Sequence, residues 1–312
     1  MRIAIPLTVL ATALVCLLTS APAHARARVF VASYGNDANS CTFGSPCKTF
    51  QHAHDAVDAG GEVSAIDSAG FGPIIITKSV TITSPDGVEA GVVPASGGDA
   101  IVINPSLSST VTLRGLTLEG SGGGLNGIAL FSSMPGTLNI IGCVIKDFSG
   151  TGISITPSNS GSFGLVITDS YVLNNAANGI EINPQTSNTT VMFGIEKTNV
   201  NGNGTSGDNA GLLFNGSSGF FRGGLSSVNI QLNNIGINFI GGNLAQETLI
   251  ANSNILFNLS GDITNNGAAS NVWLLNSNQI TTVLNNAGAV ASDGTNDILS
   301  VSGNSLSPFT RR

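Results

Sequence analysis

The sequence predicts an all-β protein: a right-handed parallel β-helix solenoid with a short N-terminal capping α-helix. Three observations carry this prediction: pairs of apolar residues five positions apart, a glycine-apolar step between the pairs, and a column of asparagines. All three recur every 25 to 32 residues. A coil of this length cannot bury its apolar face alone, whereas stacked coils bury a continuous core. The right hand is the one that such coils usually have.

The apolar pairs set one strand register over the C-terminal part of the chain. They are Leu113/Leu118, Ile140/Ile145, Ile167/Val172, Ile195/Val200, Leu225/Ile230, Ile250/Ile255, Leu275/Ile280 and Val301/Leu306. Between them a glycine followed by an apolar residue opens another short strand, at Gly127, Gly152, Gly179, Gly211 and Gly236. No helical pattern of about 10–15 residues separates the strands, which excludes an alternating α/β fold.

The asparagine column supports the same register independently. Asn175, Asn203, Asn233 and Asn258 each lie three residues beyond the second member of an apolar pair. Amides stacked at the strand spacing of about 4.8 Å can hydrogen-bond from coil to coil. We therefore expect these four side chains to form a structural ladder at one turn of the solenoid.

Residues 1–25 have the features of a secretory signal peptide. Arg2 precedes an apolar core over residues 3–18, and Ala23-His24-Ala25 is a small-x-small cleavage site. This segment predicts a secreted protein, located outside the cell, on the cell surface or in the periplasm. A lipoprotein anchor at Cys16 is the alternative, but the residue before it is Val15 instead of a small one. No second apolar run reaches the roughly 20 residues of a membrane span.

The mature chain divides into three parts. Residues 26–62 form an N-terminal loop and cap helix, in which Phe50, Ala53 and Val57 have helical spacing between Thr49 and Ala59. Such a helix would cover the exposed end of the stack. Residues 63–306 form the β-helix, with a predicted excursion over residues 84–99, and residues 307–312 form a C-terminal tail.

Three cysteines follow the signal peptide. The spacing of Cys41 and Cys47, with Gly44 and Pro46 between them, predicts a loop-closing disulfide in an oxidising compartment. A zinc site is the weaker interpretation, because two cysteines without a suitable histidine pair leave the ligand set incomplete. Cys143 lies between Ile140 and Ile145 and is predicted to be a small buried apolar residue.

Charge and composition limit the partners. The formal net charge is −7, and 41% of the residues are hydrophobic but only 9% are charged. The apolar content can support a sizeable core, and the negative charge makes nucleic acid and anionic lipid poor partners. An extracellular polysaccharide or a component of the cell surface is the partner that we expect.

At its N-terminus the chain resembles the pectin-lyase-like superfamily of right-handed β-helix proteins. The resemblance lies in Val29–Cys41, followed by the Pro46-Cys-Lys-Thr-Phe-Gln51 segment at the start of the cap helix. Residues 60–62, 70–72 and 76–82 resemble the first coil of secreted bacterial members without an assigned activity. This resemblance implies the fold over nearly the whole mature chain. It leaves the chemistry open, because the scaffold carries lyases, hydrolases, epimerases, esterases, tailspikes and adhesins.

The hydrolase motifs of that superfamily are missing from the sequence. There is no Asp pair with a Gly-His-Gly segment, and all three histidines lie at positions 24, 52 and 54, before the regular coils. His52 and His54 are two positions apart on the predicted helix, so they would point to different sides and make a poor metal pair. We expect both to be solvated.

A lyase would need acids to bind calcium and a Lys or Arg as the base. The weak catalytic candidates fall within three consecutive coils and are Asp169, Glu181, Glu196, Lys197 and Arg222. Alignment by coil instead predicts surface ion pairs between Glu119 and Lys146, Asp169 and Lys197, and Arg222 and Glu247. No cofactor is evident. Calcium is the one that the chain could hold, with Asp37 in the N-terminal loop as a weak candidate ligand beside Asn36 and Asn39, although these residue types also form turns.

Aromatic residues, the usual platforms for sugars, are scarce in the coils. Tyr171 is predicted to point outward beside Val144, and Trp273 to point inward because it alternates with Leu275. The first hypothesis is therefore a secreted, non-catalytic β-helix with a surface, matrix or glycan-binding role. The alternative is a lyase or epimerase acting on acidic glycans. A trimeric fibre or adhesin module is the second alternative, supported by Val166, Met192 and Leu249 at outward positions.

Overall fold

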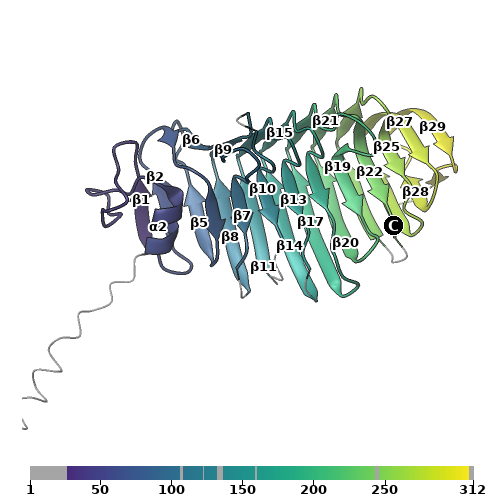
Figure 1. The fold of residues 1–312 in the computed structure, drawn as a ribbon. Helices are drawn as coiled ribbons and strands as arrows, with labels where there is room; N and C mark the ends of the chain where they lie inside the picture. The colour runs from purple at the N-terminus through teal and green to yellow at the C-terminus, as the bar shows by residue number, and fades with distance from the viewer. Residues whose placement is uncertain are drawn as a thin grey trace, which may run out of the picture.

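The computed structural model is a parallel β-solenoid whose coils stack in one direction from the N-terminal to the C-terminal end (Figure 1). It describes residues 27–105, 108–121, 123–131, 136–158, 160–242 and 246–308. The predicted signal peptide and the Cys16 alternative lie outside these residues. The predicted parallel solenoid is confirmed, while its hand stays an expectation.

One face of the solenoid is a 12-stranded parallel sheet. Its strands, in spatial order, are β1 (Arg28–Val31), β2 (Glu62–Ala65), β5 (Val80–Thr83), β8 (Ser109–Arg114), β11 (Gly136–Ile141), β14 (Gly161–Thr168), β17 (Thr189–Glu196), β20 (Phe220–Ser226), β23 (Gln246–Ala251), β26 (Ser270–Leu275), β28 (Ala289–Ser292) and β30 (Ser307–Pro308).

The other strands form an 18-stranded sheet that has two rows of strands, one for each remaining face. The first row contains β3 (Ala69–Gly70), β6 (Ala90–Val92), β9 (Leu116–Glu119), β12 (Val144–Lys146), β15 (Tyr171–Leu173), β18 (Asn199–Asn201), β21 (Asn229–Gln231) and β24 (Asn254–Leu256). The second row contains β4 (Ile74–Ile76), β7 (Ile101–Ile103), β10 (Ile128–Leu130), β13 (Ile153–Ile155), β16 (Ile180–Ile182), β19 (Ala210–Asn215), β22 (Ile235–Ile240) and β25 (Gly261–Asn265). At the C-terminal end, β27 (Gln279–Asn285) pairs with both rows, and β29 (Asp297–Gly303) pairs with β27.

The predicted apolar pairs are confirmed for the first six coils. Leu113, Ile140 and Ile167 stand opposite one another in the 12-stranded sheet, and their partners Leu118 and Ile145 do so in the first row. All five are fully buried. The pairs bracket the turn between these two faces, so each coil contributes one residue of a pair to each sheet.

The last two predicted pairs, Leu275/Ile280 and Val301/Leu306, are wrong, because the strand register places their first members at other positions. Leu274, and not Leu275, stands opposite Ile250 and is buried. The turn that follows β26 contains two consecutive residues with positive φ, Asn276 and Ser277, so this coil has one more turn residue than its neighbours. Trp273 therefore faces outward, half-buried, contrary to the prediction.

The predicted strand register is also wrong at Val301. It pairs with Val283 in β27, while Ile298 stands opposite Ile280. Val301 is exposed although its partner Val283 is buried. The predicted excursion over residues 84–99 also needs correction, since it contains the short strand β6 with Ala90 and Val92 buried in the core.

The asparagine ladder is confirmed. The Nδ2 of Asn175 donates to Oδ1 of Asn203 (2.9 Å), Asn203 donates likewise to Asn233 (3.0 Å), and Asn233 to Asn258 (3.0 Å). The ladder ends at Asp262, a buried carboxylate whose Oδ1 accepts from Nδ2 of Asn258 (2.8 Å). Each buried amide needs a hydrogen-bond partner, and the next asparagine of the ladder supplies it. The ladder therefore fixes the register between coils.

A second polar column, which the sequence analysis missed, follows the turn between the 12-stranded sheet and the first row. The backbone N–H of Cys143 donates to Oγ of Ser170, and that of Ser253 donates to Oδ1 of Asn278. Asn278 in turn donates through Nδ2 to Asn296 (2.8 Å). No single residue type revealed the column, because its equivalent positions hold Cys143, Ser170, Thr198, Val228, Ser253 and Asn278.

The helix α2 (Phe50–Ala56) lies at the N-terminal end of the stack (Figure 1). Thr49 is its N-cap and accepts from the backbone N–H of His52. His54 was predicted to be solvated, but its side chain is buried. It lies within hydrogen-bond distance of Asp55 Oδ1 through Nδ1 (3.0 Å), and it accepts from the N–H of Thr77 through Nε2 (3.2 Å). A histidine on the inner side of a cap helix therefore ties the cap to the coil that follows β4.

Candidate functional site

The predicted surface ion pairs form in two of three cases. Lys146 Nζ lies 3.5 Å from Glu119 Oε2, and the guanidinium of Arg222 pairs with Glu247. Asp169 and Lys197 occupy equivalent turn positions on adjacent coils, with φ of 51° and 46°. Within the part of the chain that the structure describes, no ion pair joins these two residues, whose side chains are both exposed.

The weak catalytic candidates do not all share a face. Glu181 lies in β16 of the second row, where Asn183 donates to it (3.0 Å). Glu196 ends β17 and Arg222 lies in β20, so both face outward from the 12-stranded sheet. Glu181 and Glu196 are thus on different faces of the solenoid.

A column of outward residues crosses the middle of the 12-stranded sheet. From coil to coil it contains Val166, Gly194, Gly224, Leu249 and Trp273, each opposite the next in the parallel register. We call these five residues the outer column. Its two central glycines leave a flat area of backbone between larger apolar neighbours.

Backbone geometry does not require these glycines. A Cβ on Gly194 would meet no heavy atom within 4 Å, and one on Gly224 would meet Leu249 at ordinary contact distances of 3.5–3.7 Å. Neither residue has a positive φ. Glycine weakens a strand and often marks a place where a ligand approaches the backbone closely. The flat area is therefore the best candidate binding surface on this face.

Charged residues border the two glycines. Along β17 and β20, Arg222 lies two residues before Gly224, and Glu196 lies two residues after Gly194. Successive outward residues on a strand are about 7 Å apart. The sequence-predicted candidates Arg222 and Glu196 therefore stand on opposite sides of the flat area.

A hollow of about 310 Å³ adjoins the flat area beside Arg222. Phe220, Thr190 and Glu247 also line it. The Arg222–Glu247 pair presents a planar donor group and a carboxylate acceptor together, which suits recognition of paired hydroxyls. Arginine remains protonated in proteins, so this residue is better suited to binding than to removing a proton.

Asp37 holds the N-terminal loop to the cap helix. Its Oδ1 accepts from the backbone N–H groups of Lys48 (2.8 Å) and Thr49 (2.9 Å), and its Oδ2 accepts from the Thr49 hydroxyl (2.9 Å). Burial alone would raise the pKa of Asp37, but these hydrogen bonds outweigh it and hold the pKa below its ordinary value. A calcium ion at Asp37 would have to compete with all three contacts.

The lowered pKa of Asp37 predicts acid sensitivity. A carboxylate with a depressed pKa stabilises the fold above its unfolded pKa of about 3.9, and this contribution is lost as pH falls through the folded value. We expect Asp37→Asn to lower the free energy of unfolding at neutral pH, with a difference from the wild type that shrinks below about pH 4. Urea unfolding of both proteins across this pH range tests it. A difference that stays constant with pH would contradict the role of the charge.

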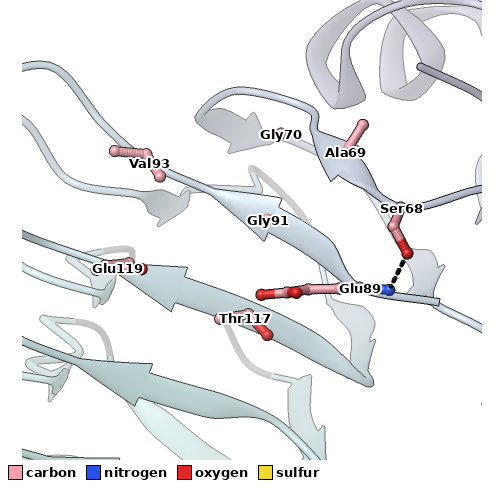
Figure 2. A pocket seen from close by; sticks show the side chains of 8 residues that line it. All are labelled: Ser68, Ala69, Gly70, Glu89, Gly91, Val93, Thr117 and Glu119. Atoms are coloured by element: carbon pink, nitrogen blue, oxygen red, sulfur yellow. Dashed lines mark hydrogen bonds between the residues drawn. The ribbon is translucent and has the colours of Figure 1, made fainter. Parts of the chain in front are cut away.

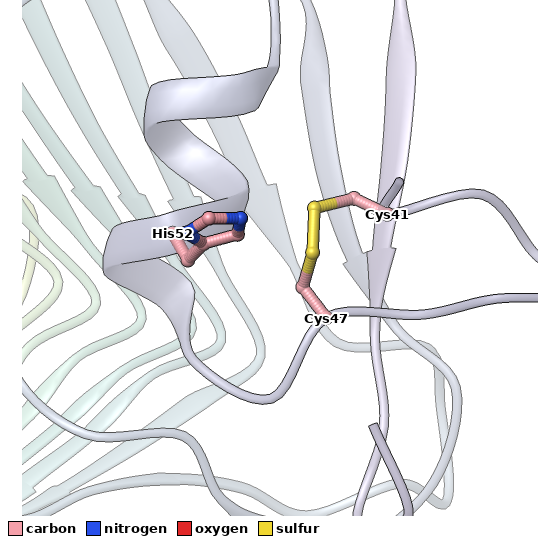
Figure 3. A group of neighbouring side chains, drawn as sticks. All are labelled: Cys41, Cys47 and His52. Carbon is pink, nitrogen blue, oxygen red and sulfur yellow. A yellow bond between two sulfur atoms is a disulfide. The ribbon is translucent and has the colours of Figure 1, made fainter. Parts of the chain in front are cut away.

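The disulfide between Cys41 and Cys47 is present, as predicted. Figure 3 shows the His52 ring directed from the helix toward this disulfide. Among the described residues, Cys41, Cys47 and His52 are the only three histidine, cysteine or acidic groups close enough to share a metal ion. Both sulfurs are bonded to each other, so neither can supply the thiolate that a metal would need. This cluster is structural in the oxidised protein.

Cys143 is buried, and burial raises the pKa of its thiol to about 11. The predicted role as a small core residue is confirmed. Tyr171 is 47% exposed and stands beside Val144 in the first row, also as predicted.

Comparison with known proteins supports the fold. No protein-family model matches the chain, and no curated protein matches it. The chain is similar to the crystal structure of pectate lyase Pel9A, with a TM-score of 0.56 and 15% identity, over 90% of this chain and 77% of that one. It also matches a rhamnogalacturonan lyase (TM-score 0.46, 12% identity, 85% and 75% covered) and a GH136 lacto-N-biosidase from Eubacterium ramulus (0.42, 10%, 91% and 68%).

The chain is thus a β-solenoid with the fold of pectate lyase, as the resemblance implied. Its structural neighbours are carbohydrate-active enzymes, including lyases and glycosidases. At these identities the similarity concerns the fold. No helix among the described residues has the length and apolar character to cross a membrane.

Proposed function

We propose that this protein is a secreted, non-catalytic β-solenoid that binds a glycan on the outer column of its 12-stranded sheet. The observation that carries the proposal is the pair of sterically unnecessary glycines, Gly194 and Gly224, in line with the outward-facing Trp273. A flat strip of backbone gives a sugar ring close access, and an indole supplies the apolar surface on which sugars stack.

The surroundings of the outer column fit a polyhydroxylated ligand. Leu249 stands between Gly224 and Trp273 and is 40% exposed, so the apolar surface continues from the flat area to the indole. Arg222 and Glu247 offer hydrogen-bond donors and acceptors beside it. Because the net charge is −7, we expect neutral glycans to bind more tightly than acidic ones in the absence of calcium.

The single tryptophan makes the test direct. Since the chain contains one Trp, its fluorescence reports on this site alone. Titration with a panel of neutral and acidic glycans should change the fluorescence for at least one glycan, with affinity confirmed by calorimetry. We expect Trp273→Ala to weaken that binding about tenfold or more, because aromatic anchors dominate such contacts.

Two sets of variants control the measurement. Gly194→Val and Gly224→Val fill the flat area and should also weaken binding, whereas Tyr171→Ala removes an exposed aromatic from another face and should not. Loss of binding in Tyr171→Ala equal to that in Trp273→Ala would contradict the assigned surface. A panel in which no glycan perturbs Trp273 would reject the proposal.

The alternative function is a lyase or epimerase acting on acidic glycans. It is favoured by Glu196 and Arg222, which lie on the same outward face, and by Lys197 in the turn that follows Glu196. Formation of unsaturated uronate from an acidic glycan, lost in Lys197→Ala, would replace the non-catalytic assignment. The exposed Val166, Met192 and Leu249 also suit self-association as a trimeric fibre, which the mass in solution decides. Recovery from the culture medium of a chain that begins at Arg26 tests secretion.

A further inference from the structure

A groove of about 320 Å³ lies on a different face, over β3, β6 and β9 near the N-terminal end (Figure 2). Its floor is formed by Gly70 and Gly91, which stand opposite each other in adjacent strands. Thr117 continues the same outward column on β9. Ligand sites commonly begin at about 300 Å³, so the groove has room for one sugar ring or a ligand of similar size.

The glycine floor has no structural cause within the described residues. A Cβ on Gly70 would meet nothing within 4 Å, and one on Gly91 would meet only backbone atoms at 3.5–3.6 Å. Neither glycine has a positive φ. Alanine would stabilise both strands, so glycine here preserves the depth of the groove at a cost in stability.

Two glutamates, one just before β6 and one at the end of β9, edge this floor. Glu89 precedes β6, and its side chain extends over the groove toward Thr117 (Figure 2). Its carboxylate is exposed and has no hydrogen bond or ion pair with any described residue. Glu119 is already engaged, since it accepts from Ser121 Oγ (3.0 Å) and pairs with Lys146 (3.5 Å). Glu89 is therefore the charge that a ligand would meet.

Hydroxyl groups complete the lining. Ser68 Oγ accepts from the backbone N–H of Glu89 (2.9 Å), which leaves its own proton free to donate to a ligand. The Thr117 hydroxyl is partly exposed and has no partner among the described residues. The groove thus combines one unpaired carboxylate with neutral hydroxyls around a floor of bare backbone.

We propose that this groove binds a sugar that carries a primary ammonium group, with Glu89 as the counter-charge and Ser68 and Thr117 as partners for its hydroxyls. The groove is larger than a bare metal ion needs. Calcium would require six to eight oxygen ligands directed at one point, and the lining residues do not provide such a set. A charged hydrogen bond to Glu89 gives selectivity for the amine over a neutral sugar. This site is independent of the outer column and of the function proposed for it.

Calorimetry on the mature protein with three related sugars tests the proposal. At about pH 6, where such an amine is protonated, we expect glucosamine to bind, while glucose and N-acetylglucosamine bind at least about tenfold more weakly. Glu89→Gln, which keeps the shape but removes the charge, should weaken glucosamine binding by a similar factor. Gly91→Val fills the groove and should abolish binding, whereas Asn254→Ala, an exposed position far along the stack, should leave it unchanged.

Several outcomes would overturn this assignment. Equal affinity for the three sugars would show that the charge is not recognised, and undetectable binding of glucosamine would reject the ligand class. Binding of calcium that Glu89→Gln abolishes, without binding of glucosamine, would reassign the groove to a cation. Because Trp273 lies on the 12-stranded sheet, its fluorescence response to glycans distinguishes failure here from failure at the outer column.

Discussion

Asn203→Ala is expected to lower the free energy of unfolding by about 3–5 kcal/mol, because each buried group left without a partner costs about 1–3 kcal/mol. Asn203 is fully buried in the middle of the ladder. Its Oδ1 accepts from both the backbone N–H and Nδ2 of Asn175, and its Nδ2 donates to Val172 O (2.9 Å) and Asn233 Oδ1 (3.0 Å). Truncation removes partners from both adjacent coils at once.

A matched control lies on the surface of the same solenoid. Asn254 is exposed in β24 and makes no side-chain hydrogen bond with a described residue, so Asn254→Ala should change stability by less than about 0.5 kcal/mol. Urea unfolding followed by circular dichroism gives both values. Similar losses in the two variants would mean that asparagine composition, and not the ladder, stabilises the coils.

The fold could be predicted from the sequence because its determinants repeat. The inward apolar positions recur in each of the regular coils, and the ladder asparagines and the glycines recur in several consecutive coils, so independent columns support one register. Leu118, Ile145 and Val172 are examples, and each is fully buried opposite the next. Errors arose where the repeat changes length, as at Asn276 and Ser277, which shifted Leu275 and Trp273 to the outer face.

The candidate sites were harder to predict because they depend on missing side chains. Gly194 and Gly224, like Gly70 and Gly91, acquire significance only after strand pairing places them side by side. Their φ values and surroundings show that they are not turn residues. In the sequence they are four glycines among 40. His54 could not be assigned either, because its burial depends on the segment around Thr77 that packs against the helix.

Gly179→Ala is expected to lower the free energy of unfolding nearly as much as the loss of a ladder amide, for a steric reason. A Cβ at this position would lie 2.6 Å from Gly211 O, 2.8 Å from Val200 Cγ1 and 2.9 Å from Asn203 Nδ2. Two of these atoms belong to the backbone or to the ladder, so they cannot move without breaking hydrogen bonds between coils. Overpacking of a dense core costs about 1–3 kcal/mol, and we expect a loss at the upper end of that range.

The same crowding explains why glycine recurs at or just before the start of the second-row strands β13, β16, β19 and β22. At Gly152, Gly211 and Gly236 a Cβ would likewise meet the carbonyl oxygen of the next coil within 2.8 Å, and also the ladder amide of its column within 2.9 Å. The glycine and asparagine columns are therefore one structural unit, since an amide can stack only where the facing residue has no side chain. Gly194→Ala, whose Cβ would point into open space, is the control for Gly179→Ala. It should leave stability unchanged or raise it by up to about 1 kcal/mol, and an equal loss in both variants would show that the steric explanation is wrong.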